Sequence, residues 1–573
     1  MVKVSRRQAL LGTVAIGAAG CANEYRHESY TSPSTKADGL FRHGVASGDP
    51  ASTSIVLWTR ITITEGTEIP VAPVTLELST DSNFSTDRKV FDLSTTAAKD
   101  WTVKHNATGL EPGRNYYYRF TSNGTTSPLG STRTLPSASI EKVRFAVVSC
   151  SNWQHGFFNA YDHIARDETF DAVIHLGDYF YEYGTDGYGS ETGREIGRLH
   201  EPDHEVLTLD DYRQRHAQYK TDAALQAMHA AHPTIHIWDD HEVANNSWEG
   251  GAENHQLDEG DWAARRRAAM QAYYEWMPLR DPEPGRSREA LYKSYSWGDL
   301  LTLVSIETRL TARAEQIDID AYSPDFSSQQ DVDDFMENVV GTDDRYLLGD
   351  AQLDFVIDAL KASKTQGQPW RFVANQILMA DVRSPDLTPY ASEEMMQTIE
   401  PAWAGIRDFV RNSAFGLPLY IDTWGGYPFA RERFYDRLAQ NGINDLVVLT
   451  GDAHEFWVND LYTDGKQKMG VELGTTSITS ETVEAFLGEG TKDFALLITK
   501  DNDCVRYYDP QHHGYIDLTV TKERVHADLI GLDTVTAREY TAFVTASFDI
   551  KKKRNTVEFK SPKGLGVTER FLY

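Results

Sequence analysis

FDAVIHLGDYFY, residues 170–181, runs from a short apolar stretch into a glycine, an acid and two tyrosines. The apolar part predicts a buried β-strand. Gly177 permits a tight turn where this strand ends, and Asp178 and Tyr181 follow closely enough to reach one centre. A carboxylate can bridge two cations, and a phenolate is a hard ligand suited to ferric iron. The alternative is a strand-capping Asp beside a packed Tyr.

Three more apolar segments end in residues that bind metals: RFAVVSC (144–150) at Cys150, IHIWDDHE (235–242) at Asp239, Asp240, His241 and Glu242, and VVLTGDAH (447–454) at Asp452 and His454. Adjacent carboxylates repel unless cations or hydrogen bonds compensate, although acids also favour helix N-termini. A single thiol is otherwise a packing residue. Functional residues collect beyond the carboxyl ends of strands in α/β sheets, so we expect these side chains to meet.

The order of strands and helices predicts two domains. Residues 40–138 alternate polar and apolar side chains with few helical periods, which predicts a small β-sandwich similar to immunoglobulin-like and fibronectin-type domains. From residue 139 to 573, apolar strands alternate with helical stretches, which is typical of an α/β domain. Residues 514–532 predict an antiparallel strand pair that extends the sheet, and residues 311–344 a surface excursion.

The composition indicates which partners to expect. Among 573 residues, 85 acidic side chains against 56 basic ones give a formal net charge of -29. A field of this sign repels phosphate backbones, so we expect no nucleic-acid binding, and a phosphate-bearing substrate requires local cations. The cysteines are Cys21, Cys150 and Cys504, too few for a disulfide framework.

The first 21 residues predict an export signal, followed by a polar linker over residues 22–39. A basic start with Arg6 and Arg7 precedes the apolar run LLGTVAIGAAG (10–20), which is too short to span a bilayer. The arginine pair favours the twin-arginine pathway over an ordinary secretory signal. Cys21 follows small residues and resembles a lipoprotein attachment site, in which case the protein would be membrane-anchored.

The four strand-end motifs, in this order, resemble an altered metallophosphoesterase pattern of the purple acid phosphatases. In that family the strands end in Asp, G-D-x-x-Y, G-N-H-D or G-N-H-E, and G-H-x-H. Here Cys150 replaces the first Asp, the Asp-Asp-His-Glu of 239–242 replaces the third motif, and Gly-Asp-Ala-His of 451–454 replaces the last. This altered set is similar to the PhoD-like alkaline phosphatases, as are RHGVASGDP (42–50), VLWTR (56–60), LGDAQLDFV (348–356) and TSITS (476–480). IETR (306–309) departs from that family, because Glu307 stands where Asp is expected.

The resemblance implies a four-layer αββα metallophosphoesterase domain and a mixed metal site. Its ferric ion (Fe3+) would be held by Cys150, Asp178, Tyr181 and His454. Asp178 would bridge to a calcium ion (Ca2+) that Asp240 and Asp452 also hold, with Asp239 and the Asn245–Asn246 region serving a second calcium. Acidic oxygen ligands suit calcium better than imidazole does. His241 would protonate the leaving group or hydrogen-bond the phosphoryl oxygens.

The implied function is an alkaline phosphatase of the periplasm or extracellular space, exported by the twin-arginine machinery. We expect a metal-bound hydroxide to attack phosphorus in line with the departing alkoxide of a phosphate ester. The alternative within catalysis is a phosphodiesterase or a phospholipase D-like enzyme. From another class, the alternative is a non-catalytic surface-binding protein, which predicts decayed ligands, whereas the expected ligands are present.

Overall fold

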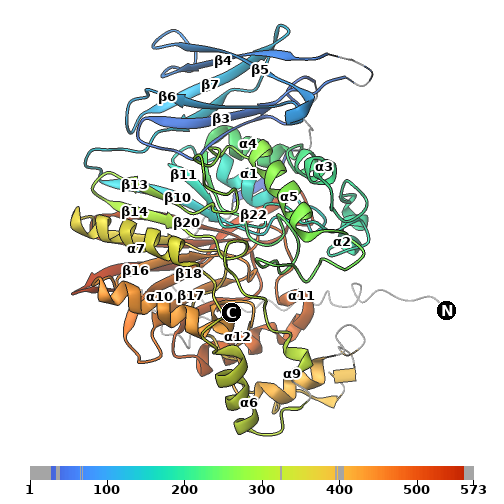
Figure 1. Ribbon diagram of the computed structural model, residues 1–573, viewed down its shortest axis with the longest axis vertical. Helices are drawn as coiled ribbons and strands as arrows, with labels where there is room; N and C mark the ends of the chain where they lie inside the picture. Colours follow the sequence, from blue (N-terminus) through green and yellow to red (C-terminus); the bar gives the residue numbers. More distant parts are fainter. Residues whose placement is uncertain are drawn as a thin grey trace, which may run out of the picture.

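The computed structural model of the protein describes residues 28–33, 39–64, 66, 69–322, 325–393, 396–397, 400 and 405–560. The predicted export signal and Cys21 lie outside these residues. Figure 1 shows an all-β unit at the top of the view and a larger α/β body below it. In the part of the chain that the structure describes, no helix is long and apolar enough to cross a membrane.

The larger sheet has eleven strands within the described residues. Their order is β1 (Glu28–Thr31), β22 (Glu539–Lys553), β21 (Val525–Leu532), β20 (His513–Thr521), β10 (Lys142–Val148), β11 (Ala172–His175), β12 (Pro233–His236), β2 (Val45–Gly48), β3 (Ser54–Arg60) and β6 (Thr102–Thr108), with β23 (Thr556–Lys560) paired to β22. β10, β11 and β12 run parallel. β20 and β21 form the antiparallel pair predicted from the sequence.

A second sheet of seven strands packs against the first. Its order is β13 (Lys293–Trp297), β14 (Leu301–Ser305), β15 (Trp370–Ala374), β16 (Leu446–Thr450), β18 (Lys468–Gly474), β17 (Phe456–Tyr462) and β19 (Val505–Asp509). One apolar core between the sheets contains Phe145 and Val147 of β10 together with Val447 and Leu449 of β16. The alternate residues of β10 face the helices instead, because side chains alternate along a strand.

Helices cover both outer faces of this pair of sheets. α1 (Asn159–Ala165), α3 (Leu209–Tyr219), α4 (Ala223–Ala231) and α5 (Trp262–Trp276) contribute to the core on the eleven-stranded sheet. α7 (Asp350–Thr365), α10 (Pro428–Gln440) and α12 (Thr491–Asp501) pack on the seven-stranded sheet. The result is a helix–sheet–sheet–helix stack, which confirms the predicted four-layer αββα architecture.

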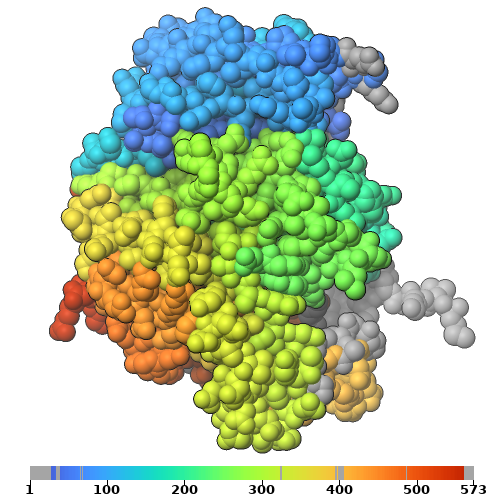
Figure 2. Space-filling model, viewed as in Figure 1, coloured from blue at the N-terminus to red at the C-terminus, as the bar shows by residue number. Residues whose placement is uncertain are grey.

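Shorter helices lie in the connections. They are α2 (Ser190–Ile196), α6 (Gln329–Phe335), α9 (Ile406–Ser413) and α11 (Glu484–Leu487), with the 3-10 helices η2 (Ala97–Lys99), η3 (Ile319–Ala321), η6 (Trp424–Gly426) and η7 (Gly488–Gly490) and the π-helix η5 (Met336–Val340). α6 and α9 belong to a lobe at the bottom of the view in Figures 1 and 2. Phe326, Phe335 and Leu417 form a small core of their own there, so the predicted surface excursion is a packed lobe.

The N-terminal unit is a β-sandwich that shares a sheet with the α/β body. Its second sheet contains β5 (Lys89–Thr95), β4 (Ala72–Ser79), β7 (Asn115–Ser122), β8 (Thr125–Thr126) and β9 (Gly130–Arg133). This sheet packs on β2 and β3 through residues such as Leu57, Leu76 and Tyr118. β2 continues the larger sheet, because Ser47 and Gly48 pair in parallel with Pro233 and Thr234 of β12.

The expected linker of residues 22–39 is not wholly irregular. β1 pairs antiparallel with β22, from Glu28 beside Ala542 to Thr31 beside Glu539. Tyr30 contributes to this attachment, because its ring stacks on Tyr540 at 5.5 Å between centroids. The chain is therefore fixed to the C-terminal strands of the α/β body before it enters the sandwich.

Candidate metal centre

The predicted ligands follow strands whose carboxyl ends meet at one edge of the two sheets. Cys150 and Asp178 follow β10 and β11, and the backbone N–H of Cys150 donates to the carbonyl of Gly177 at 3.1 Å. Asp452 follows β16 of the other sheet. A parallel bridge between Ser149 and Ser477 joins the sheets beside these residues. The strand ends of the two sheets therefore bring together residues as far apart in the sequence as Cys150 and Asp452.

The backbone is strained at the predicted ligands. Cys150, Asp178, Asp452 and His454 have φ values of 60°, 53°, 63° and 63°. Non-glycine residues rarely adopt this left-handed region, and they persist there only where the surroundings over-determine the conformation, typically at functional sites. Gly177 has φ 110°, and a Cβ at that position would lie 2.5 Å from the Asp239 Cβ. Only glycine permits this approach of the second and third strand ends.

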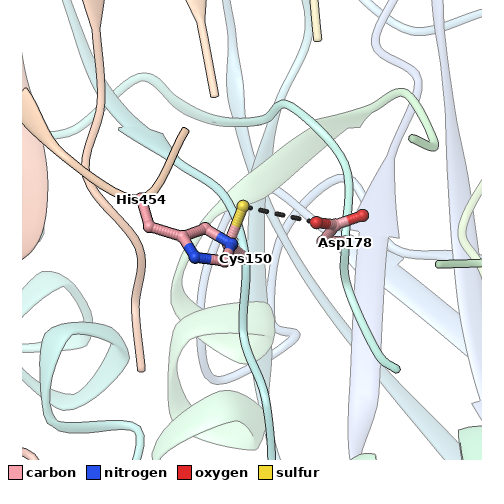
Figure 3. Close-up of side chains that lie close together, drawn as sticks. All are labelled: Cys150, Asp178 and His454. Atoms are coloured by element: carbon pink, nitrogen blue, oxygen red, sulfur yellow. Dashed lines mark hydrogen bonds between the residues drawn. The ribbon is translucent and has the colours of Figure 1, made fainter. Parts of the chain in front are cut away.

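One group of ligand atoms contains sulfur, oxygen and nitrogen. Atoms of Cys150, Asp178 and His454 lie within 4.8 Å of one another (Figure 3). The Cys150 Sγ lies 3.5 Å from Asp178 Oδ2, and the Tyr181 hydroxyl lies 3.2 Å from the same oxygen and 3.3 Å from His454 Nε2. His454 Nδ1 bonds the carbonyl of Glu481 at 2.9 Å, which fixes the ring and leaves Nε2 for the centre.

The second group is made of carboxylates. Oxygens of Asp178, Asp239, Asp240 and Asp452 lie within 4.8 Å of one another, so Asp178 is common to both groups. The buried Oδ1 atoms of Asp178 and Asp240 have no hydrogen-bond partner. Buried polar atoms are nearly always satisfied, so these two oxygens fit a cation ligand.

The electrostatics of the cluster also fit bound cations. Burial raises the pKa of the Cys150 thiol and of the Tyr181 phenol well above their usual values, and the carboxyl of Asp178 adds to both shifts. Burial likewise raises the pKa of Asp178 and Asp452. Cations placed between these groups would reverse the shifts, because the positive charge favours thiolate, phenolate and carboxylate. The mixed sulfur, nitrogen and oxygen donors suit a transition metal, and the all-oxygen group suits a hard divalent ion beside it.

His241 stands beside both groups, since a ring nitrogen and oxygens of Asp178 and Asp240 lie within 4.8 Å of one another. It is held by a carboxylate that sequence reasoning missed. Its Nδ1 lies 2.7 Å from Glu182 Oε2, and its ring lies 4.1 Å from that of Tyr181. Burial lowers the pKa of His241, but Glu182, Asp240 and Asp178 outweigh that effect and raise it well above the usual value. The contact with Glu182 thus favours the protonated form of the His241 ring. Glu182 follows Tyr181 directly, and this adjacency was the available signal.

The remaining predicted residues have different surroundings. Asp239 accepts two hydrogen bonds from Arg309, at 2.5 and 3.0 Å. The backbone N–H of Asn245 donates to Glu182 Oε1 at 2.7 Å, and that of Asn246 donates to Asp240 Oδ2 at 2.6 Å. The region predicted to bind a second calcium is therefore held by hydrogen bonds within the protein itself. Arg309 was not predicted from the sequence.

The two glutamates of these motifs are turned away from the ligand atoms. Glu242 accepts the backbone N–H groups of Asp178, Tyr179 and Asp239 at 3.2, 2.6 and 2.8 Å. It thereby ties the second strand end to the third. Glu307, which stands where the resemblance leads us to expect Asp, accepts the backbone N–H groups of 309, 310 and 311 at 2.8, 2.6 and 3.0 Å. Its role is to shape the loop that carries Arg309.

The chain resembles known proteins over most of its length. A family model described as PhoD-like phosphatase matches residues 145–529, and one for the PhoD-like phosphatase N-terminal domain matches residues 27–136. Alkaline phosphatase D of Bacillus subtilis (strain 168) is 36% identical over 529 residues, which cover 89% of this chain and 81% of the relative. A solved structure titled "Structure of PhoD" superposes with a TM-score of 0.73 at 32% identity, covering 92% of this chain and 93% of the other. The chain therefore belongs to the PhoD-like phosphatase family, whose members are metal-dependent phosphoesterases.

Proposed function

We propose that this phosphoesterase is an exported alkaline phosphatase that hydrolyses phosphate monoesters at an iron–calcium centre. Fe3+ is assigned to Cys150, Asp178, Tyr181 and His454. One Ca2+ is assigned to Asp178, Asp240 and Asp452. The observation that carries the proposal is the convergence of two ligand groups that share Asp178, one with sulfur and nitrogen donors and one with oxygens alone. These donor sets prefer different metals.

The cations, when bound, neutralise the phosphate oxygens and lower the pKa of a water nucleophile. The protein's own side chains position the reacting groups and supply the proton. The contact of His454 with the Glu481 carbonyl and that of His241 with Glu182 fix both rings before substrate arrives. His241 Nε2, whose ring carries a raised pKa, donates a proton to the departing alkoxide oxygen. The Glu182 carboxylate, 2.7 Å from His241 Nδ1, favours the protonated form of this ring.

Rates on a nitrophenyl phosphate monoester and on the bis-nitrophenyl diester test the substrate class. The proposal predicts a higher kcat/KM for the monoester. A higher kcat/KM for the diester would instead make the protein a phosphodiesterase with the same metal centre. Activity on neither ester, by protein that carries both metals, would contradict the proposal.

Export is proposed on sequence grounds. Arg6 and Arg7 precede a short apolar run, as in twin-arginine signals that carry folded, metal-loaded proteins. We expect the double variant Arg6→Lys, Arg7→Lys to accumulate active protein in the cytoplasm. Wild-type levels of the variant outside the cytoplasm would contradict this route. The variant Cys21→Ala tests lipid attachment, because a lipidated protein would leave the membrane fraction when Cys21 is replaced.

A further inference from the structure

Arg309 places a permanent positive charge inside the predicted calcium site. Its side chain is fully buried. Nε lies 2.5 Å from Asp239 Oδ1, and Nη2 lies 3.0 Å from Asp239 Oδ2 and 3.1 Å from Asp452 Oδ1. Nη2 also lies 3.7 Å from Asp240 Oδ1. One guanidinium thus faces three of the carboxylates assigned to calcium.

The position of this guanidinium is fixed by its own loop. Glu307 gathers the N–H groups of 309, 310 and 311, and it also accepts the Trp238 indole N–H at 3.1 Å. Gln352 of α7 bonds both the N–H and the carbonyl of Glu307, at 2.7 and 2.8 Å. A loop held at this many points cannot swing Arg309 away without breaking several buried hydrogen bonds.

Hydrogen bonding separates Asp239 from Asp178 and Asp240, and Asp452 is intermediate, because Arg309 bonds only its Oδ1, at 3.1 Å. Asp239 has both oxygens bonded by Arg309, and arginine stays protonated in proteins. Asp178 and Asp240 each keep a buried Oδ1 without a hydrogen-bond partner. A divalent ion at Asp239 would have to displace a bidentate ion pair and would lie against a guanidinium. A divalent ion at Asp178 and Asp240 would displace nothing.

From this geometry we infer that Arg309, and not a second divalent ion, is the cation of Asp239, so that Asp239 is a positioning residue and not a metal ligand. The inference deepens the proposed function and rests on it for the identity of calcium. Asp239 and Arg309 form one wall of the site and hold Asp452 in place. Divalent metal is bound through Asp178, Asp240 and Asp452.

Elemental analysis of the as-purified Asp239→Asn variant tests the inference most directly. The substitution removes the ion pair with Arg309 but, on this inference, removes no calcium ligand. We therefore expect the same number of calcium ions per chain as in wild type. The loss of one calcium per folded chain would overturn the inference. Near-UV circular dichroism shows that the variant is folded before its metals are counted.

A second variant, Arg309→Met, removes the charge and frees Asp239. Calcium should then be held at least about tenfold more tightly against a chelator, because a positive charge has left a site of three carboxylates. Arg313→Met is the matched control. Arg313 is also buried, and its Nη2 donates to the carbonyl of Asp422 at 2.5 Å, away from the carboxylates. Unchanged or weaker calcium binding in Arg309→Met would contradict the inference.

The double variant Arg309→Met, Asp239→Asn distinguishes this inference from the metal assignment. If the two residues are each other's ion-pair partners, the losses of unfolding free energy in the single variants should not add. The double variant should then lose less unfolding free energy than the sum of the two single losses. Additive losses would overturn the inference. Wild-type protein with no calcium would overturn the proposed metals instead, while this cycle would still decide the role of Arg309.

Discussion

Two buried clusters of titratable side chains lie on the same strands of this protein. The metal centre begins at Asp178 and Asp240, three and four residues beyond the ends of β11 and β12. The histidine cluster, defined as His175, His216, His229, His236 and Lys220, includes the last residue of each of these strands. The histidine cluster is buried, whereas Asp452 and His454 of the metal centre are partly exposed. Only the metal centre brings three or more ligand atoms within 4.8 Å of one another among the described residues.

The difference comes from where each residue stands relative to the regular strand. His175 and His236 are still in the strand, and their rings pack beside the buried ring of Tyr179. Burial lowers the pKa of His175 to about 3 and that of His236 well below the usual value, so both rings are neutral. Asp178 has left the strand with a left-handed backbone, which directs its carboxylate to the edge. Buried histidines alone thus do not indicate a metal site, whereas convergence at strained strand ends does.

Asp178→Ala should have the largest effect, because Asp178 belongs to both ligand groups. We expect loss of iron and calcium and a fall in kcat/KM of about 10³-fold or more, since charge stabilisation by metals is worth several kcal/mol. His236→Gln is the matched control on the neighbouring strand and should keep its metals. If Asp178→Ala retained metals and rate, or if the control lost them, the contrast between the two clusters would be wrong.

Cys150→Ser tests the sulfur ligand. Serine is a poor substitute for thiolate, so we expect iron retention during dialysis to fall by at least about 100-fold, given that even outer-shell changes cost about 10–100-fold. Calcium should be less affected, because Cys150 belongs to only one group. Cys504→Ser is the control, since this second free cysteine lies outside both groups. Equal iron loss in the two serine variants would refute the assignment.

Glu182→Gln should act on proton donation and leave metal content unchanged. Without the carboxylate, the pKa of His241 falls, because Glu182 is the charge that raises it most. A general acid works while protonated, so the alkaline limb of the kcat profile should move to lower pH. At alkaline pH the rate should drop about 10²-fold, the lower end of what acid catalysis contributes. An unshifted profile would mean that His241 does not act as the acid.

Lys220→Met should have the smallest effect of these variants, and it should be a gain, an increase in stability. Burial lowers the pKa of Lys220 from 10.5 to about 7. Between pH 7 and pH 10.5 this amine is therefore protonated in the unfolded chain and largely neutral in the folded one. Because the unfolded chain binds more protons, stability rises with pH across this range. The variant lacks this charge and should gain about 2 °C in Tm at pH 7, with the gain vanishing near pH 10.5. A lower Tm at pH 7 would show that the charged amine stabilises the histidine cluster.

Much of the fold follows from strand and turn patterns, and the strand-end motifs led to the site. Side chains alternate between the two faces of β10 and β16, which explains why each strand contributes to two cores. Gly177 explains how the ends of β11 and β12 approach each other. Sequence patterns did not predict Arg309 or Glu182 as site residues. Arg309 acts through contacts 70 and 143 positions away, and these depend on how the two sheets pack.

Within the expected linker of residues 22–39, the strand β1 was not predicted from the sequence. β1 is short, exposed and polar, so its sequence carries no strand signal, and pairing with β22 is what orders it. Long-range pairing of this kind cannot be predicted from local propensity.

The visible absorption spectrum of as-purified wild-type protein, with elemental analysis and with Tyr181→Phe beside it, tests the central claim most directly. Phenolate and thiolate bound to ferric iron absorb visible light. We predict a coloured protein with one iron per chain and a band that is lost or shifted in Tyr181→Phe. A colourless, iron-free and fully active wild-type enzyme would contradict the assignment of Cys150 and Tyr181.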